Sequence, residues 1–353
     1  MSDSTSRPSP LEAVHEAAGA SFTDFGGWRM PVRYGSDLAE HEAVRTAAGL
    51  FDLSHMAEFL VGGPQAAEFL DAALAGTASA IANGRAKYSL LLTDDGAILD
   101  DLVVYRLADE EYWVVANAGN HDIVAAELTA RAAGFEVTIG DETDTCALVA
   151  IQGPDALDVL GRLDGLDADP AALKYYGIVE TTWGGRPILV ARTGYTGEDG
   201  FELYVDNPGA ADLWNALVAA GAVPCGLAAR DTLRLEAGMP LYGHELTRDI
   251  RPREAGLGRV ADIGTPGARV LVGLASEGRR AGRAGYPVLR GDAVVGEVTS
   301  GALSPTLGHP IAMAYVDADA SALGTELALD VRGTAVPATV VPLPFYSRKK
   351  AGS

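Results

Sequence analysis

Residues 96–105 read GAILDDLVVY, an apolar stretch with two adjacent aspartates, Asp100 and Asp101, at its centre. Aspartate is a poor strand former, and the two-residue period of a strand turns one of the pair toward the packed side. A carboxylate buried there is costly unless hydrogen-bond donors reach it. Two interpretations follow: a bulge or edge where both side chains hydrate a turn, or a fixed carboxylate that accepts a hydrogen bond from a ligand nitrogen or tunes its protonation.

The segments on both sides of this stretch predict an α+β layer with an antiparallel sheet. A strand at EFLVG (58–62) leads to a helix opened by Pro64 at its first turn. A turn at 94–96 joins a strand at Tyr88–Leu92 to the central stretch. The pattern then continues as a strand at 112–116, a helix at about 120–133 and a strand at 135–139.

A second unit of similar style follows, and the end of the chain differs from both. Its predicted strands cover 146–151, 188–192 and 201–205. One predicted helix starts at Pro154, and two more cover 210–219 and 227–236. After about Arg269, short alternating segments separated by Gly and Pro turns predict a small all-β barrel. Near the N-terminus, 37–48 is typical of an amphipathic helix, and the first ten residues read as a frayed tail.

Composition excludes several classes of function. The 353 residues suggest two or three domains, and a net charge of −21 disfavours a nucleic-acid binder. The chain has no basic and apolar signal segment, no membrane span and only two cysteines in apolar surroundings, so we expect a soluble cytoplasmic protein. The sequence also lacks a phosphate-binding P-loop, a dinucleotide fingerprint, a nucleophile elbow and a metal-ligand pattern.

The stretch RTGYTGEDGFE (192–202) joins two predicted strands and carries a glycine at every third position from Gly194. Such glycines allow a tight turn and a close approach of the backbone to a ligand. A plain hairpin is one interpretation of this stretch. The other is a binding loop, in which the ring of Tyr195 and the carboxylate of Glu202 hold a flat heterocycle with an N–H edge.

The helix in GLAARDTLRLEAGMPLYG (226–243) is ended by Gly238 and Pro240. It carries Arg230 and Arg234. In a plain surface helix these arginines would form exposed ion pairs that contribute little stability.

Eight segments in order resemble the aminomethyltransferases of the glycine cleavage system, the T-protein family. The resemblance covers nearly the whole chain and implies three domains arranged as a cloverleaf around a central tetrahydrofolate. The implied domains are 1–55 with 145–250, an inserted domain at 56–144 that carries Asp100 and Asp101, and a C-terminal barrel at 251–353. The segments are FGGWRMPVRY (25–34), VRTAAGLFDLSHM (44–56), GAILDDLVVY (96–105), IQGPDA (151–156), RTGYTGEDGFEL (192–203), GLAARDTLRLEAGMPLYG (226–243), SGALSPTLGHPIAMAYV (300–316) and PFYSRKK (344–350).

The resemblance also implies the reaction and the residues that serve it. Family members take the aminomethyl group from the lipoyl arm of the H-protein, release ammonia and form 5,10-methylene-tetrahydrofolate from the co-substrate tetrahydrofolate. No metal is needed, because the carbon is already activated as an aminomethyl thioether. Asp101 matches the critical aspartate of the family, and the implied folate contacts are Tyr88, Asn117, Tyr195, Glu202, Arg230, Met239 and Arg348.

One segment departs from the family pattern, which leaves open a folate binder that has lost activity, and two further functions are alternatives. Residues 258–270 read GRVADIGTPGARV, which is shorter than the corresponding family segment. A demethylating folate domain without glycine-cleavage activity normally follows an FAD domain, for which 353 residues leave no room. A folate-binding accessory protein carries a reactive cysteine motif that neither Cys146 nor Cys225 matches.

Overall fold

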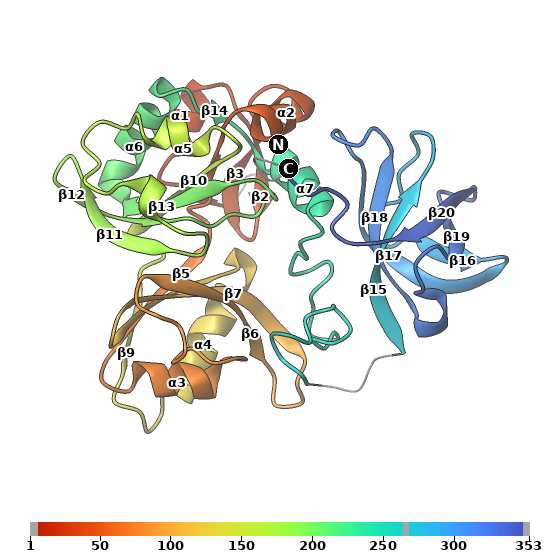
Figure 1. Ribbon diagram of the computed structural model, residues 1–353, viewed down its shortest axis with the longest axis horizontal. Helices are drawn as coiled ribbons and strands as arrows, with labels where there is room; N and C mark the ends of the chain where they lie inside the picture. Colours follow the sequence, from red (N-terminus) through yellow and green to blue (C-terminus); the bar gives the residue numbers. More distant parts are fainter. Residues whose placement is uncertain (1–5, 264–267, 349–353) are drawn as a thin grey trace. The chain divides into compact units, whose positions relative to one another are not determined.

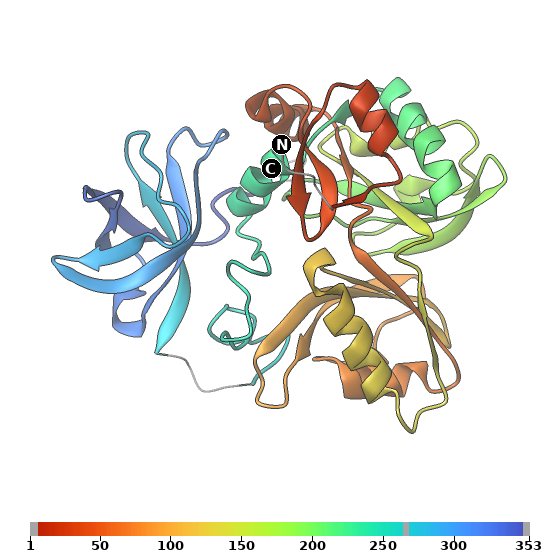
Figure 2. The ribbon, with the colours of Figure 1, turned by 180° about the vertical axis from the view of Figure 1, so that it is seen from behind.

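The computed structural model describes residues 6–263 and 268–348, drawn as coloured ribbon in Figures 1 and 2. The chain divides into two compact units. The first unit comprises the chain up to Leu91, Asp100–Gly194 and Glu198–Arg230. The second comprises Leu92–Leu99, Tyr195–Gly197 and the chain from Asp231 onward. None of the helices within the described ranges has the length and apolar character that a membrane crossing requires.

A six-stranded sheet forms one core of the first unit. Its strand order is β11-β12-β13-β10-β4-β14, antiparallel except where β14 joins β4. The helices α5 and α6 pack on it because Leu160, Leu213 and Leu217 meet the apolar side chains of β10 and β13. The strands are β4 (Gly49–Asp52), β10 (Cys146–Gln152), β11 (Ile178–Trp183), β12 (Arg186–Ala191), β13 (Gly200–Asp206) and β14 (Val223–Pro224), and the helices are α5 (Ala156–Leu160) and α6 (Asn207–Ala219).

A five-stranded sheet forms the second core of this unit and contains the paired aspartates. Its order is β6-β7-β8-β5-β9, and the helices α3 and α4 lie side by side in both ribbon views (Figures 1 and 2). The elements are β5 (Ala57–Gly62), α3 (Ala66–Ala73), β6 (Arg85–Leu92), β7 (Ile98–Ala108), β8 (Glu111–Ala116), α4 (His121–Arg131) and β9 (Thr138–Asp141).

The N-terminal segment is more ordered than its composition indicates. Residues Arg7 and Pro8 form β1, which pairs in parallel with β3 (Trp28–Arg33), itself antiparallel to β2 (Ser21–Phe25). The predicted frayed tail is therefore wrong for residues 7–10, because Ser9 is buried and donates a hydrogen bond to the buried Asp52. Residues 1–5 lie outside the described ranges. The helices here are α1 (Glu12–Ala17) and α2 (Asp37–Thr46).

The second unit contains the predicted closed barrel, with strand order β15-β18-β17-β16-β19-β20. Its inward side chains, among them Leu274, Val298 and Leu329, form a continuous apolar core. The strands are β15 (Arg269–Ser276), β16 (Pro287–Arg290), β17 (Ala293–Leu303), β18 (Pro310–Asp317), β19 (Glu326–Asp330) and β20 (Ala335–Val341). The helix α7 (Leu227–Glu236) precedes it in the chain.

The α+β class, the antiparallel sheets and the C-terminal barrel are confirmed. The three domain boundaries stay a prediction, and so does the effect of the short segment 258–270, in which residues 264–267 lie outside the described ranges.

Candidate active site

The strand β7 places Asp100 and Asp101 on opposite faces of the five-stranded sheet. The strand lies between β6 and β8, so the aspartates are at neither an edge nor a turn. Asp100 is fully buried, whereas Asp101 is partly accessible. The interpretation of this pair as a hydrated bulge or edge is therefore wrong, and each carboxyl group needs donors from the protein.

Asn117, which directly follows β8, supplies donors to both aspartates. Its backbone N–H donates to Asp100 Oδ2 over 3.0 Å, and its side-chain Nδ2 lies 2.8 Å from Asp100 Oδ1 and 2.8 Å from Asp101 Oδ1. Asn120 adds a further donor to Asp100 over 2.7 Å. One amide thus fixes the two carboxyl groups relative to each other, although they point to different faces of the sheet.

Tyr88, on β6, completes the set around Asp101. Its hydroxyl donates to Asp101 Oδ2 over 3.0 Å, so each oxygen of this carboxyl group has one donor. Asp101, Tyr88 and Asn117, which the family resemblance implied as site residues, therefore form one hydrogen-bonded cluster. Such a cluster holds a carboxylate in a fixed orientation while leaving it partly accessible.

Burial raises the pKa values of both aspartates. The pKa of Asp100 rises to about 7, mainly through loss of solvation and then through the nearby charge of Asp101, against the effect of its amide donors. Burial also raises the pKa of Asp101 to about 6, and the hydrogen bonds from Tyr88 and Asn117 limit that rise. Near neutral pH, Asp101 is therefore mostly ionised, while the pair as a whole carries fewer than two full charges.

Glu202, on β13, is held against the same face of the sheet that carries Asp101. The hydroxyl of Tyr105 donates to Glu202 Oε2 over 3.1 Å, and the hydroxyl of Thr193 donates to the same oxygen. Asp101 and Tyr105 are four residues apart on β7, so their side chains share one face at a spacing of about 13 Å along the strand. Both of these donors bind Oε2.

Sequence reasoning missed Tyr105 and Thr193. The signal for Tyr105 was present, because the two-residue period that separates Asp100 from Asp101 also turns Tyr105 to the side of Asp101. Thr193 had no comparable signal, since its contact depends on how the loop 192–199 folds over β13.

The glycines of that loop have a structural role that the sequence did not show. A Cβ atom at Gly194 would lie 2.0 Å from Gln152 Oε1, and one at Gly200 would lie 2.3 Å from Gln152 Nε2. Gln152 is fully buried and donates to the carbonyl of Thr193 over 3.0 Å. At these two positions the space beside the backbone is filled by Gln152, and a close approach of the loop backbone to a ligand stays a prediction.

Arg230, near the middle of α7, is half-buried with its guanidinium 6.0 Å from the ring centre of Phe51. The pKa of the neighbouring His55 is lowered to about 4, first by burial and then by the positive charge of Arg230, although Asp52 opposes this shift. The guanidinium of Arg230 is thus a fixed positive charge near the neutral imidazole of His55.

Three predicted contact residues belong to the second unit. The hydroxyl of Tyr195 donates to the carbonyl of Pro240, and Met239 donates through its backbone N–H to the carbonyl of Arg234 over 3.0 Å. Arg348 is exposed near the end of the described chain. Their roles toward a ligand stay predictions.

Arg234 corrects the expectation that the arginines of α7 form exposed ion pairs. Its side chain is 1% exposed and pairs with the fully buried Glu245 over 2.8 Å. It also donates to Asp231 and Ser300. Removing one partner of such a buried pair is far more costly than removing a surface charge.

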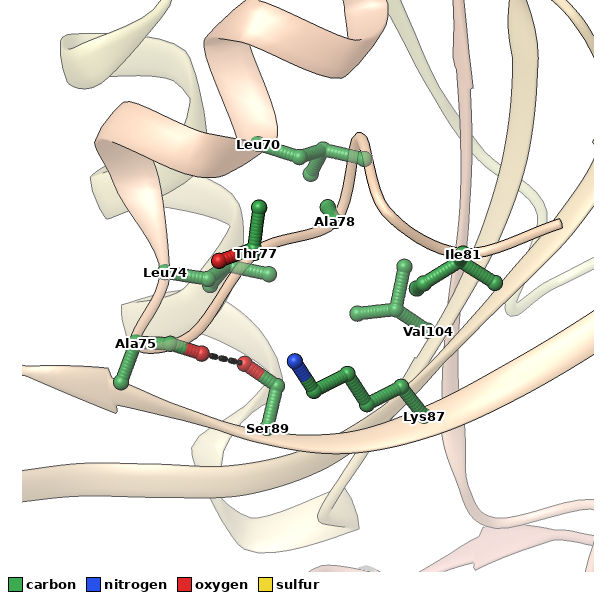
Figure 3. Close-up of a pocket in the computed structure, with 9 residues that line it drawn as sticks. All are labelled: Leu70, Leu74, Ala75, Thr77, Ala78, Ile81, Lys87, Ser89 and Val104. Carbon is green, nitrogen blue, oxygen red and sulfur yellow. Dashed lines mark hydrogen bonds between the residues drawn. The ribbon is translucent and has the colours of Figure 1, made fainter. Parts of the chain in front are cut away.

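A small cavity elsewhere in the five-stranded sheet region has no comparable chemistry. It measures about 10 Å³, and Figure 3 shows the side chain of Lys87 entering a largely apolar lining beside Ser89, whose hydroxyl donates to the carbonyl of Ala75. This volume suits about one water molecule and no organic ligand.

Comparisons with known proteins give consistent results along the whole chain. The profile of the GCVT N-terminal domain matches residues 11–265, and that of the glycine cleavage T-protein C-terminal barrel domain matches residues 269–347. A protein of Cutibacterium acnes named aminomethyltransferase is 58% identical over 98% of this chain and 99% of its own length. A protein of the same name from Streptomyces coelicolor is 54% identical over 99% of this chain and 100% of its own.

A solved structure agrees with these sequence matches. The glycine cleavage system aminomethyltransferase T from Bartonella henselae superposes with a TM-score of 0.90 at 38% identity, covering 96% of this chain and 98% of that one.

Proposed function

The chain belongs to the glycine cleavage T-protein family and is an aminomethyltransferase, and from this premise we propose how its residues carry out the transfer. The donor is the aminomethyl group on the lipoyl arm of an H-protein. The acceptor is tetrahydrofolate, a co-substrate, and the products are ammonia, 5,10-methylene-tetrahydrofolate and the dihydrolipoyl form of the H-protein.

Asp101 is the proposed catalytic residue. Positive charge develops at the transferred carbon as ammonia leaves, and an ionised carboxylate fixed nearby stabilises that charge without having to reorient. The donors Tyr88 and Asn117 hold Asp101 for this purpose and help to keep it ionised despite its burial. The hydrogen-bonded cluster of these three residues is the observation that carries the proposal.

Glu202 is the proposed clamp for the pterin ring. A pterin presents an amide N–H and an amine along one edge, and a carboxylate accepts hydrogen bonds from both. Tyr105 and Thr193 fix the orientation of this carboxylate. The separation of about 13 Å between Asp101 and the Tyr105 position on one sheet face favours an elongated ligand that places its ring at one end and its reactive nitrogens at the other.

Arg230 is the proposed partner for the negatively charged folate. The folate tail carries carboxylates, which a guanidinium binds well. In a chain of net charge −21, a fixed positive charge of this kind matters more than it would on a neutral protein.

The direct experiment combines the purified protein with aminomethylated H-protein and tetrahydrofolate and measures ammonia release. We expect release that depends on both substrates. Ammonia release that does not require the H-protein would contradict the donor assignment. Tetrahydrofolate binding without any release would favour a folate-binding protein that lacks transfer activity.

A further inference from the structure

Glu58, on β5, is a buried carboxyl group that the proposed transfer does not use. The residue is 1% exposed, and no N–H or O–H group among the described residues donates to Oε1 or Oε2, so that the weakly donating thiol of Cys146 is the one hydrogen-bonding group beside it in the described ranges. Such a group is costly to bury, and more so when ionised. Its position therefore calls for an explanation beyond packing.

The strand register places Glu58 on the face of the five-stranded sheet that carries Asp101 and Tyr105. Glu58 lies opposite Val115 of β8, and Val115 lies opposite Val103 of β7. Since Val103 is two residues from both Asp101 and Tyr105, Glu58 shares their face. Trp113, two residues from Val115, shares it too, and its buried Nε1 likewise has no partner among the described residues.

The groups around Glu58 favour its neutral form. The ionisable side chains that act on it are the thiol of Cys146 on β10, Asp141 and Glu142 at the end of β9, and Glu202 on β13; Tyr204 on β13 is in turn affected by Glu58. No ion pair to Glu58 occurs within the described ranges. Burial raises the pKa of Glu58 to about 8, the three carboxylates add to that rise, and only the weakly donating thiol opposes it.

A chain of aromatic contacts leads from this region to the clamp. The ring of Tyr204 packs edge-on against Trp113 at 5.9 Å and against Tyr105 at 6.1 Å. The hydroxyl of Tyr204 donates to that of Tyr105 over 3.3 Å, and Tyr105 in turn donates to Glu202. Tyr204 lies within electrostatic range of Glu58. A negative charge at Glu58 would therefore attract these hydroxyl donors, because a buried carboxylate favours any O–H or N–H group that can turn toward it.

We propose that Glu58 is a positioning residue which, as a neutral acid, leaves Tyr204 and Tyr105 free to orient the Glu202 clamp, and which loosens that clamp when it ionises. The inference rests on the proposed function, which names tetrahydrofolate as the ligand. It deepens that function by making tetrahydrofolate affinity dependent on a side chain that does not touch the ligand.

The test compares wild type with Glu58→Gln, which is close in shape to the neutral acid and cannot ionise, and with Glu110→Gln as a control at an exposed glutamate. Tetrahydrofolate affinity is measured by calorimetry at about pH 7 and about pH 9 under anaerobic conditions. Wild type and the control should lose affinity at the higher pH. Glu58→Gln should keep its affinity, and a loss equal to that of wild type would overturn the positioning role.

Urea unfolding without any ligand provides an independent readout. The folded state holds the Glu58 proton up to about pH 8, whereas the unfolded chain releases it at the ordinary glutamate pKa, so this residue makes wild type less stable as pH rises between those values. The advantage of Glu58→Gln in urea midpoint should therefore grow from about pH 5 to about pH 9. An unchanging difference would show that Glu58 is not a neutral acid.

The two readouts separate the possible failures. If the urea midpoints respond as expected but wild type does not bind tetrahydrofolate at all, the proposed function fails while the neutral state of Glu58 stands. If Glu58→Gln does not fold, infrared spectra of wild type serve instead. They must then show the carbonyl stretch of a protonated carboxylic acid that disappears as pH rises through about 8, and its absence would contradict the proposal.

Discussion

At the scale of single residues, the site contains carboxyl groups that neighbouring amides and hydroxyls hold in place, and burial raises the pKa values of two of them, Asp100 and Asp101. Asp101 receives one donor on each oxygen, whereas both donors of Glu202 bind a single oxygen. This difference fits the two roles proposed above, a carboxylate held rigidly beside developing charge for Asp101 and a ring clamp for Glu202.

The clamp role of Glu202 predicts a loss of affinity when its charge is removed. Hydrogen bonds to a charged group contribute about 1.5–3 kcal/mol, so Glu202→Ala should raise the Kd for tetrahydrofolate by about 10- to 100-fold. Isothermal calorimetry measures the change, with Glu180→Ala on the exposed edge strand β11 as the control. If Glu202→Ala binds as tightly as the control, the clamp is assigned to the wrong residue.

The raised pKa of Asp101 predicts an acid limb in the rate profile. The transfer requires the ionised carboxylate, so kcat should fall as pH decreases through about 6. With the ordinary pKa of aspartate, the rate would fall only near pH ~3.9. A rate that stays constant from neutral pH down to about 5 would show that Asp101 does not titrate in the catalytic step.

At the scale of elements, the loop 192–199 shows which features could be predicted from the sequence and which could not. The sequence predicted the strands on both sides of this loop, and its glycines together with Tyr195 and Glu202 suggested a binding loop as one of two interpretations. The reason for Gly194 was not predictable, because it depends on Gln152, which is 42 residues away in the chain and reaches the loop only after the sheet has formed.

The packing of this loop predicts the cost of adding a single methyl group. In Gly194→Ala, the new Cβ would meet the buried amide of Gln152, so we expect destabilisation of about 1–3 kcal/mol in urea unfolding. Gly35→Ala is the matched control, since nothing lies within 4 Å of a Cβ there. Combining Gly194→Ala with Gln152→Ala should recover part of the loss, and a double variant with additive losses would contradict this explanation.

Contacts between residues that are distant in the sequence also explain the other differences between the predicted and the observed structure. The helix α7 was predicted with its observed bounds, because its ends carry clear Gly and Pro signals. The burial of Arg234 was not predicted, since its partner Glu245 lies beyond the helix. The N-terminal strand β1 was missed because its partner strand and the buried Asp52 that binds Ser9 are distant in sequence.

At the scale of the whole molecule, the sequence matches cover both units, while the hydrogen-bonded cluster of Asp101, Tyr88 and Asn117 belongs to the first. The family profiles span nearly the full chain, and the superposition on the Bartonella henselae structure covers 96% of it. The net charge of −21 makes fixed arginines such as Arg230 important for a substrate that is itself anionic. The central claim is that Asp101, rather than its neighbour Asp100, acts on the transferred carbon.

The measurement that tests this claim most directly is ammonia release from aminomethylated H-protein by Asp101→Asn and Asp100→Asn, with tetrahydrofolate affinity measured on the same preparations. We expect Asp101→Asn to bind tetrahydrofolate nearly as well as wild type and to lose about a hundredfold or more in kcat. Asp100→Asn should lose less per folded molecule. An Asp101→Asn variant that turns over at the wild-type rate, or that is impaired less than Asp100→Asn, would contradict the account.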